Sequence, residues 1–219
     1  LAGPEIALAS TKAYTAQISV MYLLAFRFAF AKGTIDESRL RALTAQLLGA
    51  PAAIRKVIDN KDECQFIASK LVNADNLFCI GRTFDYALSL EGSLKLKEIS
   101  YIHSEAYAAG ELKHGTISLI EPGIPVITVA TQANILAKTI SNMEEVKARG
   151  GVIIAVCRKG TVFAEGTVDM KLEIDADLDD MMVPLPTVCA LQLIAYYTSV
   201  LRGIDPDKPR NLAKSVTTE

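Results

Sequence analysis

The stretch LKLKEISYIHSEAYAAGELKHG, residues 94–115, places both histidines of the chain among lysines and glutamates. A carboxylate that is partly removed from water beside a lysine can be tuned for proton transfer, because burial raises the pKa of the acid and the cation lowers it. Glu91, Lys95 and Glu98 have this composition. This part of the chain is therefore the first candidate for acid–base chemistry.

A helix predicted over residues 84–99 must position these charges. At about 100° per residue, Glu91, Lys95 and Glu98 fall within a sector of roughly 60° that lies between two apolar stripes. Another side of the helix carries the residues that we expect to face solvent: Ser89, Ser93 and Lys97. An ordinary i,i+4 ion pair, worth a few tenths of a kcal/mol, also explains Glu91 and Lys95. Spacing alone leaves the structural and the functional interpretation open.

The remaining titratable candidates differ in setting. His103 follows Tyr101-Ile102 in what we expect to be a short extended segment, and a structural role explains it. His114 is the next-to-last residue of AYAAGELKHG, a stretch whose small residues permit close backbone approach, as in loops that position side chains at a site. A surface loop explains His114 equally well. Lys214, close to the last residue, has by position alone the character of a solvated charge.

Composition excludes several classes of function. The chain has 219 residues, half of them apolar, and its 23 basic and 25 acidic side chains leave a net charge of -2. Such a balance disfavours nucleic acid and anionic membranes as partners. The four cysteines form no CxxC pair, so we expect reduced core residues and a cytoplasmic protein. No metal-ligand spacing and no nucleotide-binding glycine motif is present in the sequence, and we expect neither metal nor cofactor.

The most apolar segment is ISVMYLLAFRFAFA, from Ile18 to Ala31. Arg27 interrupts it, and it falls short of the ~20 apolar residues that a membrane span requires. We therefore expect a helix that is buried on most sides and ends by Gly33. Because the chain begins with Leu rather than Met, we expect its first residues to come from the middle of a longer protein.

The alternation of apolar runs and helical stretches predicts the fold. Strands are predicted at NLFCIG (76–81), IPVITVAT (124–131) and GGVIIAVC (150–157), with helices over 84–99 and 134–148 between them. Fully apolar strands that alternate with helices indicate a parallel sheet covered on both faces. MKLEI (170–174) is predicted as an edge strand and 187–201 as the last helix. The expected fold is a three-layer α/β/α domain with a mainly parallel sheet.

A helical segment precedes this domain. After Gly33 the sequence predicts two amphipathic helices, with a break near Gly49-Ala50-Pro51, and a third helix in DECQFIASKLVN.

Three stretches of the sequence resemble one family. They are STKAYTAQ, GRTFDYALSLEGSLKLKEISYIHSEAYAAGELKHG and the terminal DPDKPRNLAKSVTTE, and they are similar to the isomerase part of the glutamine:fructose-6-phosphate amidotransferase (glucosamine-6-phosphate synthase) family. The resemblance extends over essentially the whole chain. Members have an N-terminal glutaminase domain, which frees ammonia from glutamine, followed by two sugar isomerase (SIS) subdomains of three-layer α/β type.

The resemblance implies a division of this chain. Residues 1–33 would be the helix-containing tail of the first SIS subdomain, 34–74 connecting helices, 75–208 the second SIS subdomain, and 209–219 a C-terminal active-site loop. It also implies an activity: fructose 6-phosphate and glutamine would be converted to glucosamine 6-phosphate and glutamate, with glutamine bound by the longer protein.

The resemblance further implies roles for individual residues. Glu98 would move a proton between C1 and C2 of the sugar, Lys214 would form a Schiff base with the open-chain ketose, and His114 would assist ring opening. In the family this histidine reaches the site of the neighbouring subunit, so a homodimer is implied. The remaining residues implied to contact substrate are Lys95, Leu8, Ser10 and Ala213.

The sequence departs from the family pattern in parts that bear on activity. The Ser/Thr-rich phosphate loop of the first SIS subdomain and the N-terminal cysteine nucleophile of the glutaminase lie outside this sequence, and Leu8 stands where valine is usual. We therefore expect the chain by itself to be inactive and to bind fructose 6-phosphate weakly. Two other functions stay open: a sugar-phosphate-binding regulatory module, because SIS folds also serve regulators, or a phosphosugar isomerase or deglycase independent of glutamine.

Overall fold

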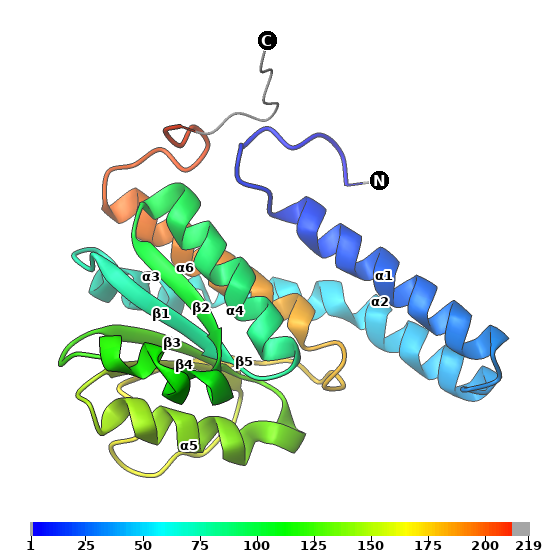
Figure 1. The fold of residues 1–219 in the computed structure, drawn as a ribbon. Coiled ribbons are helices and arrows are strands. Elements are labelled where there is room, and N and C mark those ends of the chain that lie inside the picture. Colours follow the sequence, from blue (N-terminus) through cyan, green and yellow to red (C-terminus); the bar gives the residue numbers. More distant parts are fainter. Residues whose placement is uncertain (1, 212–219) are drawn as a thin grey trace.

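The computed structural model describes residues 2–211 and contains one five-stranded sheet between helical layers (Figure 1). All strand pairs are parallel, in the order β2-β1-β3-β4-β5. The strands are β1 (Asn76–Gly81), β2 (His103–Ala108), β3 (Pro125–Ala130), β4 (Val152–Arg158) and β5 (Met170–Ile174). The α-helices are α1 (Lys12–Ala31), α2 (Glu37–Asp59), α3 (Lys61–Leu71), α4 (Phe84–Lys95), α5 (Leu136–Lys147) and α6 (Pro184–Leu201). The predicted three-layer α/β/α fold with a helical segment before it is confirmed.

The two faces of the sheet bury separate apolar clusters. Helices α3, α4 and α6 cover one face, where the cluster includes Leu77, Leu88 and Ile194. Helix α5 and the 3-10 turns η2 (Ala109–His114) and η3 (Thr116–Leu119) cover the other face (Figure 1). The central strands β3 and β4 are apolar over nearly their whole length because both of their faces are buried.

Strand β2 is the element that the sequence analysis missed. The prediction kept only a short extended segment at His103 and a loop after it, whereas HSEAYA is a strand paired in parallel along the full length of β1. It lies at the edge of the sheet and most of its residues are only half-buried, so it lacks the apolar run that marks β3 and β4. The other four strands lie where the sequence predicts them.

The N-terminal helices differ from the prediction in two ways. The expected break near Pro51 is wrong, because α2 continues through this proline and buries Ala50, Ala53 and Val57 on its inner side. The expectation that α1 is buried on most sides is also wrong within this chain, since Phe26 is its only buried residue. α1 packs mainly on α2 (Figure 1), and within residues 2–211 its large apolar side chains Val20, Met21, Leu23, Leu24 and Phe28 are exposed.

Length and composition alone would let α1 and α6 cross a membrane. In the most apolar 18-residue stretch of α6, 61% is buried inside the domain, as in a core helix, whereas only 6% of the corresponding stretch of α1 is buried. The four cysteines are free thiols, as predicted, and burial raises the pKa of Cys64 and Cys79 to about 12.

Candidate active site

Helix α4 changes its winding at the residues that carry the candidate chemistry. The α-helix gives way to a single π-helical turn over Leu96–Ser100, and the turn ends at Tyr101 in the left-handed conformation, with φ 60° and ψ 18°. The Ser199 hydroxyl of α6 donates a hydrogen bond of 2.8 Å to the Ile99 carbonyl in this turn. Single π turns inside α-helices are frequent at functional sites, because they re-aim side chains.

The solvent-facing side predicted for this helix is partly wrong. Ser89 and Ser93 are buried, whereas Leu90 and Leu94 are exposed. Helix α4 packs against both the sheet and α6. The small side chains of Ser89 and Ser93 fit at these close contacts. The Ser89 hydroxyl donates to the carbonyl of Asp85, and Ser104 of β2 donates to Ser93.

Glu91, Lys95 and Glu98 lie together, as their spacing predicts. The Lys95 ammonium is 2.6 Å from a carboxylate oxygen of Glu98 and 3.6 Å from one of Glu91. Only 4% of the Lys95 side chain and 8% of the Glu91 side chain are exposed, against 22% for Glu98. The i,i+4 pair of Glu91 and Lys95 is therefore present but buried, and Glu98 is the member of the cluster that solvent or a ligand can reach.

Glu91 is the member of this cluster to which the family resemblance gave no role. Burial raises the pKa of its carboxyl group, the Lys95 cation opposes this shift, and Glu98 adds to it. Burial and the nearby Glu91 charge also raise the pKa of the Tyr14 phenol on α1. The side-chain amide of Gln192 on α6 also opposes the rise in the Glu91 pKa. The cluster thus carries two carboxylates for one ammonium, in a poorly hydrated setting.

Glu98 opens onto a cavity of about 410 Å³. The cavity is lined by Lys97, Glu98, Tyr101, Ile102, His103, Arg210 and Asn211. His103, predicted to be structural, therefore lines the same cavity as Glu98, and its Nδ1 lies 2.9 Å from the Asn76 side-chain oxygen. The C-terminal segment contributes a wall through Arg210. The family resemblance implied an active-site loop over residues 209–219, but no local pattern pairs Tyr101 with Arg210, because the contact joins residues 109 positions apart.

The N-terminal segment runs beside the C-terminal one (Figure 1). The amide of Leu8 donates to the carbonyl of Asp207 at 3.4 Å, and Ala9 is buried in the core. Leu8 and Ser10 do not line the cavity themselves. Ala213 and Lys214 lie outside the described residues.

His114 and Glu98 lie beyond opposite ends of strand β2. Glu98 precedes the amino end of β2, and His114 follows its carboxyl end in η2, where it is exposed. The six residues of β2 rise about 3.3 Å each, so the strand alone separates the two by roughly 20 Å. One copy of this chain therefore does not bring His114 and Glu98 together.

The switch point of the sheet, between β1 and β3, is filled by the chain itself. Parallel sheets commonly bind ligands beyond the carboxyl ends of their strands at this place. Here the buried Asp85 carboxylate accepts from the Thr131 amide at 2.8 Å, the Thr131 hydroxyl at 2.5 Å and the Gln132 amide at 3.2 Å. The amides that could receive a phosphate are thus occupied.

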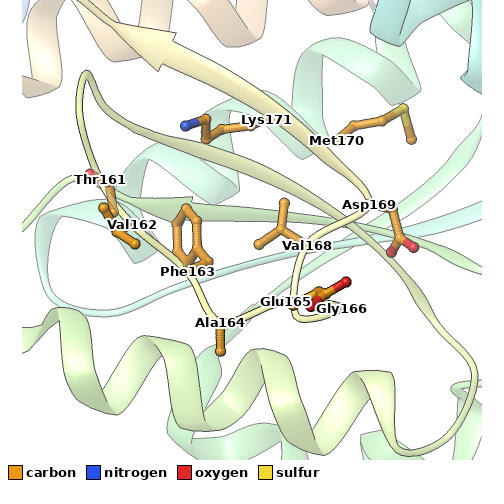
Figure 2. A pocket seen from close by; sticks show the side chains of 10 residues that line it. All are labelled: Thr161, Val162, Phe163, Ala164, Glu165, Gly166, Val168, Asp169, Met170 and Lys171. Carbon is orange, nitrogen blue, oxygen red and sulfur yellow. The ribbon is translucent and has the colours of Figure 1, made fainter.

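A second hollow, of about 380 Å³, lies within the loop between β4 and β5, and Figure 2 shows its lining. All ten lining residues belong to the single segment Thr161–Lys171. Two of its three charged residues are engaged, because Asp169 pairs with Lys147 at 2.8 Å and Lys171 pairs with Glu173 at 2.9 Å. The Glu98 cavity is therefore the better candidate for chemistry.

Comparison with known proteins identifies the fold family. The model of the SIS domain matches residues 70–202, more than half of the chain. The chain belongs to the SIS domain family. This SIS chain is 51% identical over its full length to a glutamine–fructose-6-phosphate aminotransferase [isomerizing] from Caldanaerobacter subterraneus, and 50% identical to one from Clostridium tetani. It spans 36% of the length of each of these relatives.

Solved structures agree with this assignment. The C-terminal domain of a glucosamine-fructose-6-phosphate aminotransferase from Francisella tularensis superposes with a TM-score of 0.88 at 34% identity, covering 94% of this SIS chain and 58% of that chain. A glucosamine-6-phosphate deaminase from Thermotoga maritima, at 24% identity and a TM-score of 0.68, shows a similar fold.

Proposed function

We propose that this SIS chain is the C-terminal isomerase portion of a glutamine–fructose-6-phosphate aminotransferase, which forms glucosamine 6-phosphate from fructose 6-phosphate and glutamine. The observation that carries the proposal is the ion pair between buried Lys95 and half-buried Glu98, which opens onto a cavity beside the C-terminal segment. The identity to relatives of that name over the whole chain supports it. The four free thiols fit a protein of the cytoplasm.

Glu98 is the proposed proton shuttle. A single carboxylate on one face of the open-chain sugar can take a proton from C1 and return it to C2. Lys95 holds this carboxylate at 2.6 Å and, in the proposed mechanism, keeps it oriented. Glu91 holds the same ammonium from its buried side, so that Lys95 stays in place when Glu98 turns toward the sugar.

Lys214 is the proposed Schiff-base lysine. An imine at C2 withdraws electrons from C1 and so acidifies the protons that Glu98 must move. Lys214 is four residues beyond Arg210, a cavity residue, and four residues of chain reach at most about 14 Å. This tether supports a role for Lys214 in the Glu98 cavity. We assign contacts with substrate to Ala213, Leu8 and Ser10 as part of the same proposal.

The test of the proposal replaces Glu98 by Gln in the full-length protein that contains this chain. We expect glucosamine 6-phosphate formation to fall by at least a hundredfold, the lower range for loss of an acid–base group, while glutamine hydrolysis continues. Glu144→Gln, an exposed change on α5, is the matched control and should keep both activities. Retained sugar isomerisation in Glu98→Gln would refute the role of Glu98. Sugar binding without turnover in the unchanged protein would instead indicate a regulatory module.

A homodimer completes the proposed site. The position of His114, a strand length away from Glu98, supports a role in the cavity of the neighbouring subunit, where it would assist ring opening. Mixing subunits tests this arrangement. In a dimer of one Glu98→Gln and one His114→Asn subunit, one site carries both changes and the other carries none.

Random mixing of these two inactive variants should therefore restore about one quarter of the unchanged activity, as expected for a two-fold symmetric dimer with shared sites. Mixtures of two different changes at Glu98 serve as the control and should stay inactive. If His114 acted within its own subunit, both sites of the mixed dimer would be defective and no activity would return.

A further inference from the structure

Arg82 lies where the chain leaves strand β1 and turns into α4. The residue before it, Gly81, has no room for a side chain, because a Cβ there would collide with the Asp85 backbone. The Asp85 amide closes the turn by donating to the Arg82 carbonyl at 3.0 Å. Thr83, the next residue in this turn, has φ 53° and ψ -123°, a conformation that favours glycine. Strain of this kind persists only where surrounding contacts enforce it, so the backbone on both sides of Arg82 is fixed.

The Arg82 side chain is held by α5 and covers η2. Its Nε donates a hydrogen bond of 3.0 Å to the side-chain oxygen of buried Asn142, and the Asn142 side chain donates in turn to the Glu145 carboxylate at 3.3 Å. The Arg82 guanidinium lies over Gly110, because a Cβ on this glycine would be 2.8 Å from Nη2 and 3.1 Å from Nη1. The guanidinium thus occupies the place that a side chain at position 110 would take.

The turn η2 needs support of this kind. It has six residues, and runs of 3-10 helix longer than about four residues are uncommon because their hydrogen-bond geometry is poor. Ala109 and Leu112 are fully buried and anchor one side of the turn in the apolar cluster beneath it. Gly110 lies between them, and its backbone is the least restricted of any residue type. The guanidinium covers this glycine, and four residues later the same turn ends at exposed His114.

We propose that Arg82 positions η2 so that His114 is presented to the neighbouring subunit. Asn142 holds the guanidinium and Gly110 leaves room for it. All three are positioning residues, and none of them is assigned a contact with substrate. The role of Arg82 rests on the proposed function, because it presumes that His114 assists ring opening in the neighbouring site. The contact between Arg82 and η2 can be tested without any substrate.

The first experiment measures amide hydrogen exchange of residues 109–114 in the full-length protein, by mass spectrometry of peptides. Arg82→Ala removes the guanidinium that covers Gly110. We expect exchange in η2 to become about threefold to tenfold faster, the change that follows from losing one net contact. Arg55→Ala, an exposed change on α2, is the matched control and should leave the rate unchanged. Unchanged exchange in Arg82→Ala would overturn the contact.

The second experiment measures kcat for fructose 6-phosphate in the full-length protein. Arg82→Ala should lower kcat about tenfold, less than the roughly hundredfold expected for loss of an acid–base group itself. Gly110→Ala should lower kcat as well, because its methyl group displaces the flexible end of the Arg82 side chain. Both changes act on one contact, so Gly110→Ala should cost nothing further in the Arg82→Ala background. Losses that multiply in the double variant would contradict the shared contact.

Subunit mixing tests which catalytic group Arg82 serves. In a dimer of one Arg82→Ala and one Glu98→Gln subunit, the site with intact Glu98 receives His114 from the subunit with intact Arg82. Random mixing of these variants should therefore restore about one quarter of the unchanged activity. Mixing Arg82→Ala with His114→Asn should restore none, because every site then has a replaced or misplaced His114. Restoration in the second mixture alone would assign Arg82 to Glu98, and restoration in neither would indicate a general structural defect; either result overturns the proposal.

The outcomes separate the role of Arg82 from the proposed function. Faster exchange in η2 with unchanged kcat in Arg82→Ala would overturn the positioning role and leave the proposed function standing. Unchanged protein that makes no glucosamine 6-phosphate would overturn the proposed function, and the exchange result would still stand or fall by itself. If Glu98→Gln mixed with His114→Asn restored nothing, the shared site would be refuted, and with it the presentation of His114 to a neighbour.

Discussion

The Asp85 carboxylate makes a quantitative prediction about stability. It is fully buried at the switch point of the sheet and accepts three hydrogen bonds. Burial raises its pKa in spite of these donors, so the ionised group bears a desolvation cost. Asp85→Ala removes this cost, but it leaves the Thr131 and Gln132 amides without an acceptor in a buried position.

The magnitude follows from the two orphaned amides. Each buried donor without a partner costs about 1–3 kcal/mol. The Thr131 hydroxyl can rotate, and relief of the Asp85 desolvation offsets part of the cost. We therefore expect Asp85→Ala to lower the free energy of unfolding by about 3 kcal/mol. Asp85→Asn keeps one acceptor oxygen and should lose less.

Urea unfolding of the 219-residue chain, followed by circular dichroism, measures this difference. Asp75→Ala is the matched control, because Asp75 is exposed just before β1 and its loss should change stability by less than about 0.5 kcal/mol. A loss below about 1 kcal/mol in Asp85→Ala would refute the reasoning, since it would mean that water satisfies the two amides as well as the carboxylate does.

Two further predictions concern the elements around the site. A Cβ at Gly81 would lie 2.4 Å from the backbone of Asp85, so Gly81→Ala should cost about 3 kcal/mol or more in the same urea assay, whereas Gly160→Ala, in open space at φ +81°, should cost about 1 kcal/mol. For Glu91, the raised pKa means that the folded chain keeps a proton which the unfolded chain has already lost. Its contribution to stability therefore falls as pH rises from the ordinary glutamate pKa through the raised one. Glu91→Gln should flatten this decline when unfolding is compared at pH 5 and pH 8, and an unchanged slope would contradict it.

Local sequence patterns determined most of the elements. The apolar runs that became β1, β3 and β4 are buried on both faces, and this burial is what makes such runs recognisable. The periodicity of α4 placed Glu91, Lys95 and Glu98 in one sector, because a helix sets the angle between its own side chains whatever surrounds it. The acid–base cluster could therefore be predicted before any tertiary contact was known.

Other features could be decided only by tertiary structure. Ser89 and Ser93 are buried because α6 and the sheet approach α4 closely, and a hydroxyl periodicity cannot reveal that neighbour. Strand β2 is defined by its pairing with β1 rather than by its own half-buried residues. The π turn at Leu96–Ser100 likewise receives a hydrogen bond from α6, a distant segment of the chain.

The assembly of the cavity is the clearest case. Tyr101 and Arg210 are far apart in the sequence, and chain folding alone brings them together beside Glu98. The separation of His114 from Glu98 is likewise set by the direction of β2 in a parallel sheet. Sequence alone determined which charged residues lie together and which helix presents them, because both depend on residues close together in the chain. The tertiary structure decided what faces them, because that depends on contacts between distant segments.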